Sequence, residues 1–210
     1  MGTKEKLIVY AIENNIAALD VLEDVFNNNE TYEFHYIKVS GNDSQEVEKS
    51  RDEDKEIIMG TLMKETFDIL ILDLLLRDNM DTEREKIEGD DFKGIETLLS
   101  LEVARELKKT SGKQEFLPVF ISSSRKCNNQ SKFRAMKEKN EVLIPEDAVF
   151  IFKPSDNPKK KYKDCPISSH SEDPVCNKKQ KDLGGCSPKS CFIELLTKYY
   201  EEYIEKKNGN

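Results

Sequence analysis

Four polar residues of this chain each follow a run of apolar residues: Glu13, Asp73, Ser123 and Lys153. Two carboxylates, a hydroxyl and an ammonium group form a useful set if folding brings them together. Carboxylate oxygens are the ligands that Mg²⁺ prefers, and Mg²⁺ keeps water and phosphate oxygens in its remaining positions. A hydroxyl and an ammonium group can hydrogen-bond to a phosphoryl group and neutralise its charge. The set therefore predicts chemistry on a phosphoryl group, assisted by a magnesium ion.

Asp73 is the most informative of the four, because it ends the apolar run 69–72. A short run of this kind is typical of a strand that is buried on both faces of a parallel sheet. Burying an unpaired carboxylate costs free energy, so Asp73 should emerge at a site or meet a cation. The alternative interpretation is that Asp73 only caps the turn or helix that follows.

The remaining elements must position these side chains, and the sequence predicts strands and helices in alternation. Further strands are predicted at residues 7–12, 32–39, 116–121 and 148–152. Apolar residues at helical spacing predict a helix that begins at residue 16 and further helices at 57–63, 94–109, 131–139 and 192–204. The stretch 41–54 is polar and is predicted to be a loop or a frayed helix start. Strands joined through helices should be parallel with right-handed crossovers. The pattern therefore predicts a doubly wound α/β domain.

Length, charge and hydropathy exclude several classes of protein. The 210 residues fit one domain over 1–210, with insertions at 77–93 and 157–190. The net charge of −8 argues against a nucleic-acid binder, so no direct DNA binding is expected. No apolar run approaches the length of a membrane span, and the first residues contain no signal-peptide core. We therefore expect a cytoplasmic protein without a membrane partner.

The strand ends, taken together, resemble the receiver domain of two-component response regulators, which has the chemotaxis-type fold. The matching segments are 12–15 (acidic pair), 70–73 (phosphoacceptor strand), 117–123 (strand ending in Ser or Thr) and 150–154 (last strand, with an aromatic residue and Lys-Pro). The resemblance covers about residues 6–156 and the final helix, less 77–93. It implies a flavodoxin-like fold, with a five-stranded parallel sheet in the strand order 2-1-3-4-5 and helices on both faces.

The resemblance also implies roles for the individual residues. Asp73 would be the carboxylate nucleophile that takes a phosphoryl group from a phosphohistidine. Lys153 would contact Asp73 and then the phosphoryl oxygens, and Ser123 would move to hydrogen-bond that group. Phe150 would swing inward together with Ser123 and repack the face formed by the last two strands and the last helix.

The same resemblance implies a magnesium site made of Glu13, Asp73, Asn14 and the backbone carbonyl of Leu75. Asn14 departs from the family pattern, because an amide stands where a second acid is usual. It brings an oxygen but no charge, so weaker Mg²⁺ binding is expected. Another register would place residues 10–11 at the acidic pair and leave the first strand without a ligand. The register with Glu13 is preferred, because it sets Glu13 at the end of the apolar run.

A second departure follows Asp73, where receiver domains usually turn through a proline and then a glycine. Here Arg77 stands at the proline position, and the glycine is reached only at Gly94. The extra residues contain acids that can replace the missing charge or occlude the site: Asp78, Asp81, Asp90 and Asp91. The simpler interpretation is a surface loop without such a role.

The second insertion is rich in cysteine, with Cys165, His170, Cys176, Cys186 and Cys191 in one short stretch. The Cys-x4-His and Cys-x4-Cys spacings would allow each pair to grip a Zn²⁺ ion, which would give the segment a reason to fold. The alternative is free thiols on an extended arm, with Cys191 beginning the last helix.

Two functions follow as hypotheses. In the first, the chain is a stand-alone receiver that a histidine kinase or phosphotransfer protein phosphorylates and that then switches contact with a downstream protein target. In the second, it is a degenerate receiver that serves as a scaffold without phosphate chemistry. Any enzymatic activity would be limited to self-phosphorylation and autodephosphorylation. A dedicated enzyme is disfavoured, since no histidine or glycine-rich phosphate loop accompanies the acids.

Overall fold

The core of the molecule is a five-stranded parallel sheet. The structure is a computed structural model that describes residues 5–39, 51–74, 76, 98–110, 115–122, 144–154 and 188–209. The strands are β1 (Leu7–Glu13), β2 (Tyr32–Lys38), β3 (Ile69–Asp73), β4 (Leu117–Ser122) and β5 (Val149–Phe152). Their order is β2-β1-β3-β4-β5, and every neighbouring pair is parallel. The predicted flavodoxin-like α/β fold is therefore confirmed.

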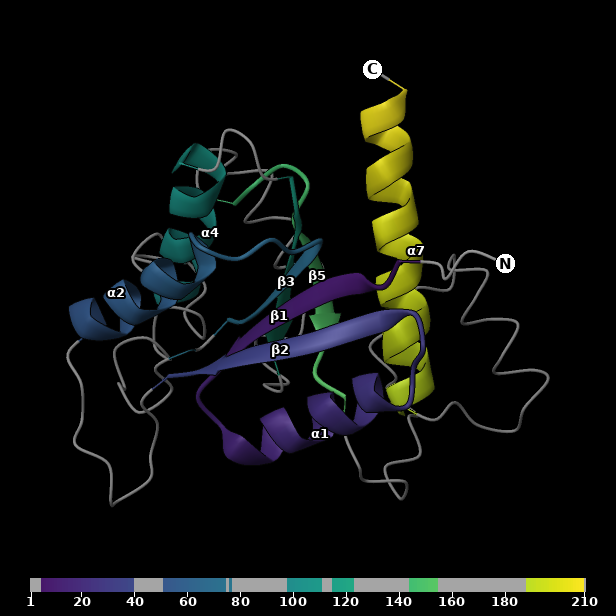
Figure 1. Ribbon diagram of the computed structural model, residues 1–210, viewed down its shortest axis with the longest axis horizontal. Helices are drawn as coiled ribbons and strands as arrows, with labels where there is room; N and C mark the ends of the chain where they lie inside the picture. The colour runs from purple at the N-terminus through teal and green to yellow at the C-terminus, as the bar shows by residue number, and fades with distance from the viewer. Residues whose placement is uncertain are drawn as a thin grey trace, which may run out of the picture.

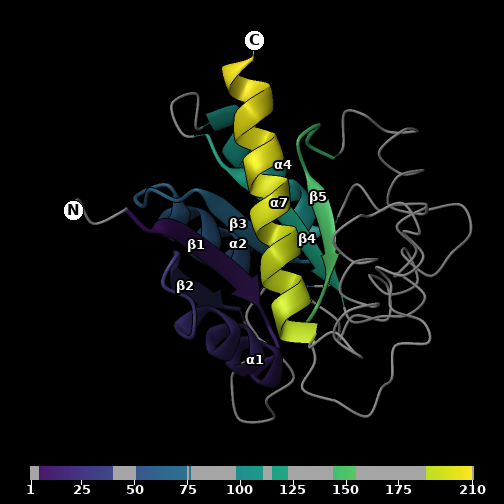
Figure 2. The same cartoon turned by 90° about the vertical axis from the view of Figure 1, so that its right-hand side faces the viewer.

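Helices cover both faces of this sheet. Those in the described ranges are α1 (Ile16–Asn27), α2 (Arg51–Leu62), α4 (Leu99–Thr110) and α7 (Pro188–Asn208). Figure 2 shows α7 in front of the strands, α2 and α4 behind them and α1 below them. Residues of α1 and α7 share one core cluster, on the face opposite α2 and α4. The C-terminal turns of α7 project beyond the sheet (Figure 1). The arrangement has the three layers of a doubly wound domain.

Alternation along the strands explains the two core layers. On β1, Val9 and Ala11 belong to the cluster that packs against α1 and α7, whereas Tyr10 and Ile12 belong to the cluster that packs against α2 and α4. All five residues of β3 are buried, because both faces of this central strand are covered. The unbroken apolar run before Asp73 matches this environment, because no residue of the strand faces water.

Two helix boundaries differ from the sequence-based prediction. Helix α2 begins at Arg51, inside the stretch 41–54 predicted as a loop or a frayed helix start, and earlier than the predicted helix at 57–63. Its first turn carries three acids, 52–54, which the partial positive charge of a helix N-terminus favours. Helix α4 begins at Leu99 rather than at Gly94. Leu98 is not helical, and its carbonyl accepts the first hydrogen bond, from the N–H of Glu102.

Several predicted segments lie outside the described residues. They are the insertion at 77–93, the helix at 131–139 and nearly all of the insertion at 157–190. Helix α7 begins at Pro188, so the last three residues of that insertion are helical. Within the described ranges, none of the helices combines the length and the apolar composition that a membrane crossing requires.

Candidate functional site

Two buried carboxylates and one lysine meet at the carboxyl ends of the strands. Glu13 ends β1 and Asp73 ends β3, and these two strands are neighbours. Lys153 directly follows β5. Its Nζ atom lies 2.7 Å from Glu13 Oε2 and donates a hydrogen bond of 2.8 Å to Asp73 Oδ2. Since β4 separates β5 from β3, the long lysine side chain must reach across β4. We call Glu13, Asp73 and Lys153 the carboxylate–lysine cluster.

Glu13 is fully buried, and both of its carboxylate oxygens are engaged. Oε1 accepts hydrogen bonds from the backbone N–H groups of Asn14 at 3.2 Å and Asn15 at 3.1 Å. Oε2 accepts no hydrogen bond of regular geometry within the described residues, so its contact with Lys153 is an ion pair. The side chain is therefore held between its own loop and the lysine.

The local sequence explains why the chain turns sharply after Glu13. Asn15 has extended backbone angles, and its side chain accepts a hydrogen bond of 3.2 Å from the N–H of Ala18. This is the geometry of a helix N-cap, which asparagine favours. Strand β1 thus passes into α1 through only two residues, and Glu13 is fixed at the edge of the sheet, where parallel α/β sheets bind ligands.

The cluster carries more negative than positive charge. Burial and the neighbouring Asp73 raise the pKa of Glu13 to about 7, against the opposing effects of Lys153 and the Asn15 N–H. Burial lowers the pKa of Lys153, but the charges of Asp73 and Glu13 outweigh it, and the net shift of that pKa is upward.

Both pKa values are shifted upward, but the two shifts have opposite consequences for the ion pair. The upward shift of Lys153 favours the pair, whereas the upward shift of Glu13 opposes its ionisation. The reason is that one ammonium group cannot neutralise two buried carboxylates. Burial and the charge of Asp73 therefore both disfavour the ionised form of Glu13, whose side chain is fully buried. With both acids ionised, the cluster has one negative charge in excess.

That excess charge and the nature of the donors suit a hard divalent cation. Magnesium takes oxygen ligands, and here two carboxylates come from adjacent strands. Among the described residues no group of three or more His, Cys, Asp and Glu side chains comes together, so a cation would need further oxygens from the backbone, an amide or water. The donors fit Mg²⁺, but Lys153 already contacts both carboxylates.

The other predicted site residues divide into two groups. Asn14 is partly exposed beside Glu13, and Phe150 is 4% exposed in the core cluster on the α4 side of the sheet. The ring of Phe150 thus packs on the face of the sheet that α2 and α4 cover, and its role as a switch residue remains a prediction. Leu75 and Ser123 lie outside the described residues. Their roles remain predictions.

The predicted zinc set falls almost wholly outside the described residues. Cys165, His170, Cys176 and Cys186 belong to that part of the chain, and only the backbone of Cys191 is described. Cys191 lies in the first turn of α7, where the alternative interpretation put it. The zinc site remains a prediction.

One contact at this end of the sheet has no counterpart in the sequence-based predictions. The hydroxyl of Ser100, in the first turn of α4, donates a hydrogen bond of 3.1 Å to the carbonyl of Leu74, the residue after Asp73. The signal in the sequence was weak but present. Ser100 interrupts a dense apolar run, where a serine must find a partner when it is buried.

Searches against known proteins gave likenesses of structure only. No protein-family model matches the chain, and no curated protein matches it. A signal receiver domain of an HD domain-containing protein from Pseudomonas fluorescens Pf-5 is similar with 9% identity, a TM-score of 0.48 and coverage of 99% of this chain and 96% of that chain. The two-component response regulator RcsB, solved in complex with DNA, is similar with 13% identity, a TM-score of 0.40 and coverage of 90% and 68%.

A fusion protein containing a trimeric coiled-coil segment of yeast Spc42 is also similar, with 10% identity, a TM-score of 0.46 and coverage of 100% and 89%. All of these identities are below 25% and all of these TM-scores are below 0.5, so any inference about the chemistry of this chain must rest on its own side chains.

Proposed function

We propose that this chain is a receiver-like signalling protein that accepts a phosphoryl group on Asp73 and thereby switches contact with another protein. The observation that carries the proposal is the lysine shared between two buried carboxylates, with Lys153 Nζ 2.8 Å from Asp73 and 2.7 Å from Glu13. A buried carboxylate next to an ammonium group at the carboxyl edge of a parallel sheet is suited to nucleophilic attack on a phosphoryl group.

In the proposed reaction an oxygen of Asp73 attacks the phosphorus atom of a phosphohistidine on a histidine kinase or phosphotransfer protein. One P–O bond forms, the P–N bond breaks, and the leaving imidazole nitrogen takes the electron pair and a proton from water. Lys153 stays charged and passes from the Asp73 carboxylate to the oxygens of the phosphoryl group. A bound Mg²⁺ ion would offset the charge of the incoming phosphoryl group, with Glu13 and Asp73 as its carboxylate ligands and Asn14 beside them.

A second candidate function is favoured by the geometry of Glu13. Its Oε1 atom already accepts two backbone N–H groups, and its Oε2 atom faces Lys153. With Asn14 in the place of a second acid, a carboxylate so fully engaged is a poor metal ligand. The chain would then be a degenerate receiver in which the carboxylate–lysine cluster stabilises the fold and the protein serves as a phosphorylation-independent scaffold.

Titration with beryllofluoride in the presence of Mg²⁺, followed by amide NMR shifts, separates the two functions. The signalling function predicts saturable shifts around residues 13, 73 and 153 in the wild type. It predicts their loss in Asp73→Asn and their retention in the matched control Asp68→Asn, at the other end of the same strand. A wild type without Mg²⁺-dependent shifts would leave the scaffold function standing.

A further inference from the structure

Ser100 is a fully buried polar residue whose hydroxyl is directed away from its own helix. It is the second residue of α4, and it has no exposed surface. A serine in the first turn of a helix commonly bonds to backbone groups of that turn. Here the Oγ atom instead donates to the carbonyl of Leu74, 26 positions earlier in the chain, at 3.1 Å. The contact joins the start of α4 to the segment that leaves Asp73.

Leu74 is held at both of its backbone polar groups. Its N–H donates a hydrogen bond of 2.8 Å to the carbonyl of Ile121 on β4, and its C=O accepts from Ser100. Asp73 itself pairs with Ile121 in the register of the two strands. The two bonds thus fix the direction of the chain immediately after Asp73. Without the hydroxyl, the Leu74 carbonyl would be buried with one partner fewer and could turn.

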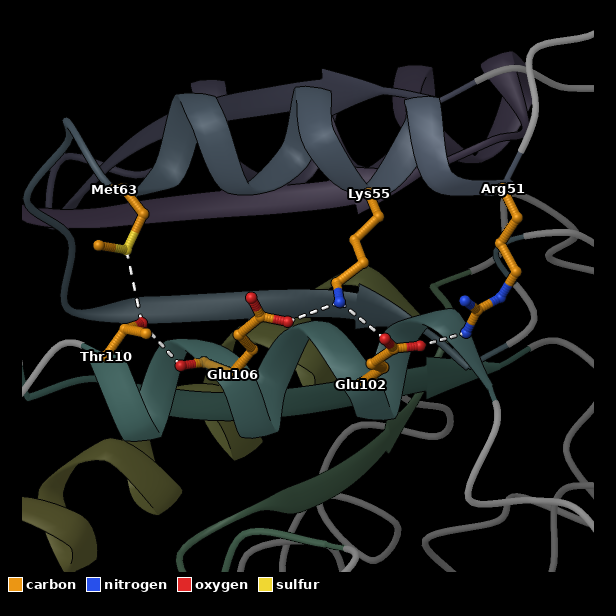
Figure 3. A network of polar contacts seen from close by, with 6 residues as sticks. All are labelled: Arg51, Lys55, Met63, Glu102, Glu106 and Thr110. Atoms are coloured by element: carbon orange, nitrogen blue, oxygen red, sulfur yellow. Dashed lines mark hydrogen bonds and ion pairs between the residues drawn. The ribbon is translucent and has the colours of Figure 1, made fainter.

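The start of α4 is itself anchored to a neighbouring helix, as Figure 3 shows. Glu102, two residues after Ser100, pairs through one oxygen with Arg51 and through the other with Lys55 at 2.7 Å. Lys55 also reaches Glu106, one turn further along α4, at 2.6 Å. These ion pairs hold the first turns of α4 against α2. Ser100 therefore extends from a fixed element and not from a freely moving one.

We propose that Ser100 is a positioning residue for the phosphoacceptor site: by holding the Leu74 carbonyl, its hydroxyl fixes the backbone that orients the Asp73 carboxylate toward Lys153. The expected effect on phosphorylation rests on the proposed function. The orientation of Asp73 does not, because it can be measured in the unphosphorylated protein. The hydrogen bond of Ser100 goes to the Leu74 carbonyl and not to the carboxylate or the ammonium group, so its effect is indirect.

The test compares Ser100→Ala, Ser100→Thr and Tyr200→Phe with the wild type. Alanine removes only the hydroxyl and favours helix, so α4 should form as before. Threonine keeps the hydroxyl and serves as the conservative rescue. Tyr200→Phe is the matched control, because it removes another long-range side-chain bond, to Asp68 at 3.2 Å, at the opposite end of β3. Thermal unfolding of all three variants shows what each change does to stability.

The first readout is the rate of phosphorylation by acetyl phosphate with Mg²⁺. Ser100→Ala should lower the rate at saturating donor about tenfold, with little change in the concentration that gives half the maximal rate, because misplacing the nucleophile acts on the reaction step. Ser100→Thr should recover most of that rate, and Tyr200→Phe should stay within about twofold of the wild type. A rate for Ser100→Ala equal to that of the wild type, or an equal loss in Tyr200→Phe, would overturn the proposal.

The second readout does not depend on phosphorylation. The carboxyl ¹³C shift of Asp73 in the metal-free protein should move in Ser100→Ala, and it should remain at its wild-type position in Ser100→Thr and Tyr200→Phe. If the wild type takes no phosphoryl group while this pattern holds, the proposed function fails and the positioning role stands. If the Asp73 shift is unchanged in Ser100→Ala, the positioning role fails, whatever the wild type does with acetyl phosphate.

Discussion

Lys153 is the residue on which the carboxylate–lysine cluster depends, because its ammonium group is paired with both buried acids. Replacing it with methionine keeps much of the side-chain volume and removes the charge. We expect Lys153→Met to lower the free energy of unfolding at pH 7 by about 3 kcal/mol, the usual cost of leaving a buried charge without its partner. Urea unfolding measures this loss.

Two further variants make that measurement specific. Adding Glu13→Gln to Lys153→Met should recover part of the loss, since it removes one of the two uncompensated acids. Lys109→Met, at an exposed position on α4, should change the free energy of unfolding by no more than about 0.5 kcal/mol. Equal stability of Lys153→Met and the wild type would show that the ammonium group contributes nothing to the fold.

The pH dependence of stability should report on Glu13. Its pKa is raised from an ordinary value of 4.5 to about 7 by burial and by Asp73, so between these values the folded protein binds more protons than the unfolded chain. The stability that this group contributes is complete below pH 4.5 and is lost as the pH rises through about 7.

The experiment compares the wild type with Glu13→Gln in chelator, so that no metal competes with the proton. The free energy of unfolding of the wild type, minus that of Glu13→Gln, should fall between pH 4.5 and about 7. A difference that stays flat across this window, or that rises, contradicts the upward shift of the Glu13 pKa.

The cluster itself could be predicted from the sequence, because parallel strands end at one edge of a sheet. An apolar run precedes each of Glu13, Asp73 and Lys153, and these positions alone predicted that the three side chains lie close together. Ser100 could not be found in this way. Its partner is a backbone carbonyl, which residue types do not identify. The only signal in the sequence is the position of a serine within an apolar run, and a serine in a helix is usually interpreted as part of the polar face.

At the scale of elements, the last helix is tied to the amino end of the sheet by Asp68. One oxygen of this carboxylate accepts the N–H of Ile8 at 2.8 Å, and the other accepts the hydroxyl of Tyr200 at 3.2 Å. Tyr200→Phe should lower the free energy of unfolding by about 1 kcal/mol, the typical worth of such a bond. Tyr36→Phe, at an exposed tyrosine of β2, should cause almost no change. Denaturant titration of the two variants settles whether the bond to Asp68 contributes to stability.

Partly exposed ion pairs join α2 to α4, so their contribution to stability should depend on salt. Burial tends to raise the pKa of Glu102, but the hydrogen bonds and charges of Lys55 and Arg51 outweigh it, so that the net shift is downward. The side chains are about one quarter to one third exposed, which limits the worth of the pairs. Glu102→Gln should cost about 1 kcal/mol in low salt and clearly less in molar sodium chloride. A loss that is independent of salt would point to packing instead.

The elements that the sequence predicted well are those with a uniform environment. Strand β3 is buried on both faces, and its apolar run predicted the position of the strand correctly. The sequence leaves the start of helix α2 open between a loop and a frayed helix start, because its first turn is acidic, although acids stabilise a helix start. Helix α4 was placed too early, because Gly94 and the residues after it continue the apolar spacing without a capping signal.

At the scale of the whole molecule, two polar arrangements lie at opposite ends of one buried strand. Asp68 immediately precedes β3 and fastens α7 to the sheet, whereas Asp73 ends β3 and pairs with Lys153. The core layers between them are formed almost entirely by apolar side chains. The two aspartates thus have separate tasks, and each provides a control for the other in any experiment on phosphorylation.

The most direct test of the account is the intact mass of the protein after incubation with acetyl phosphate and Mg²⁺, with peptide mapping of any added phosphoryl group. The account predicts one phosphoryl group on Asp73 in the wild type, the same group in Asp68→Asn, and none in Asp73→Asn. A wild type that gains no mass, or an Asp73→Asn variant that gains as much as the wild type, would contradict the assignment of Asp73 as the phosphoacceptor.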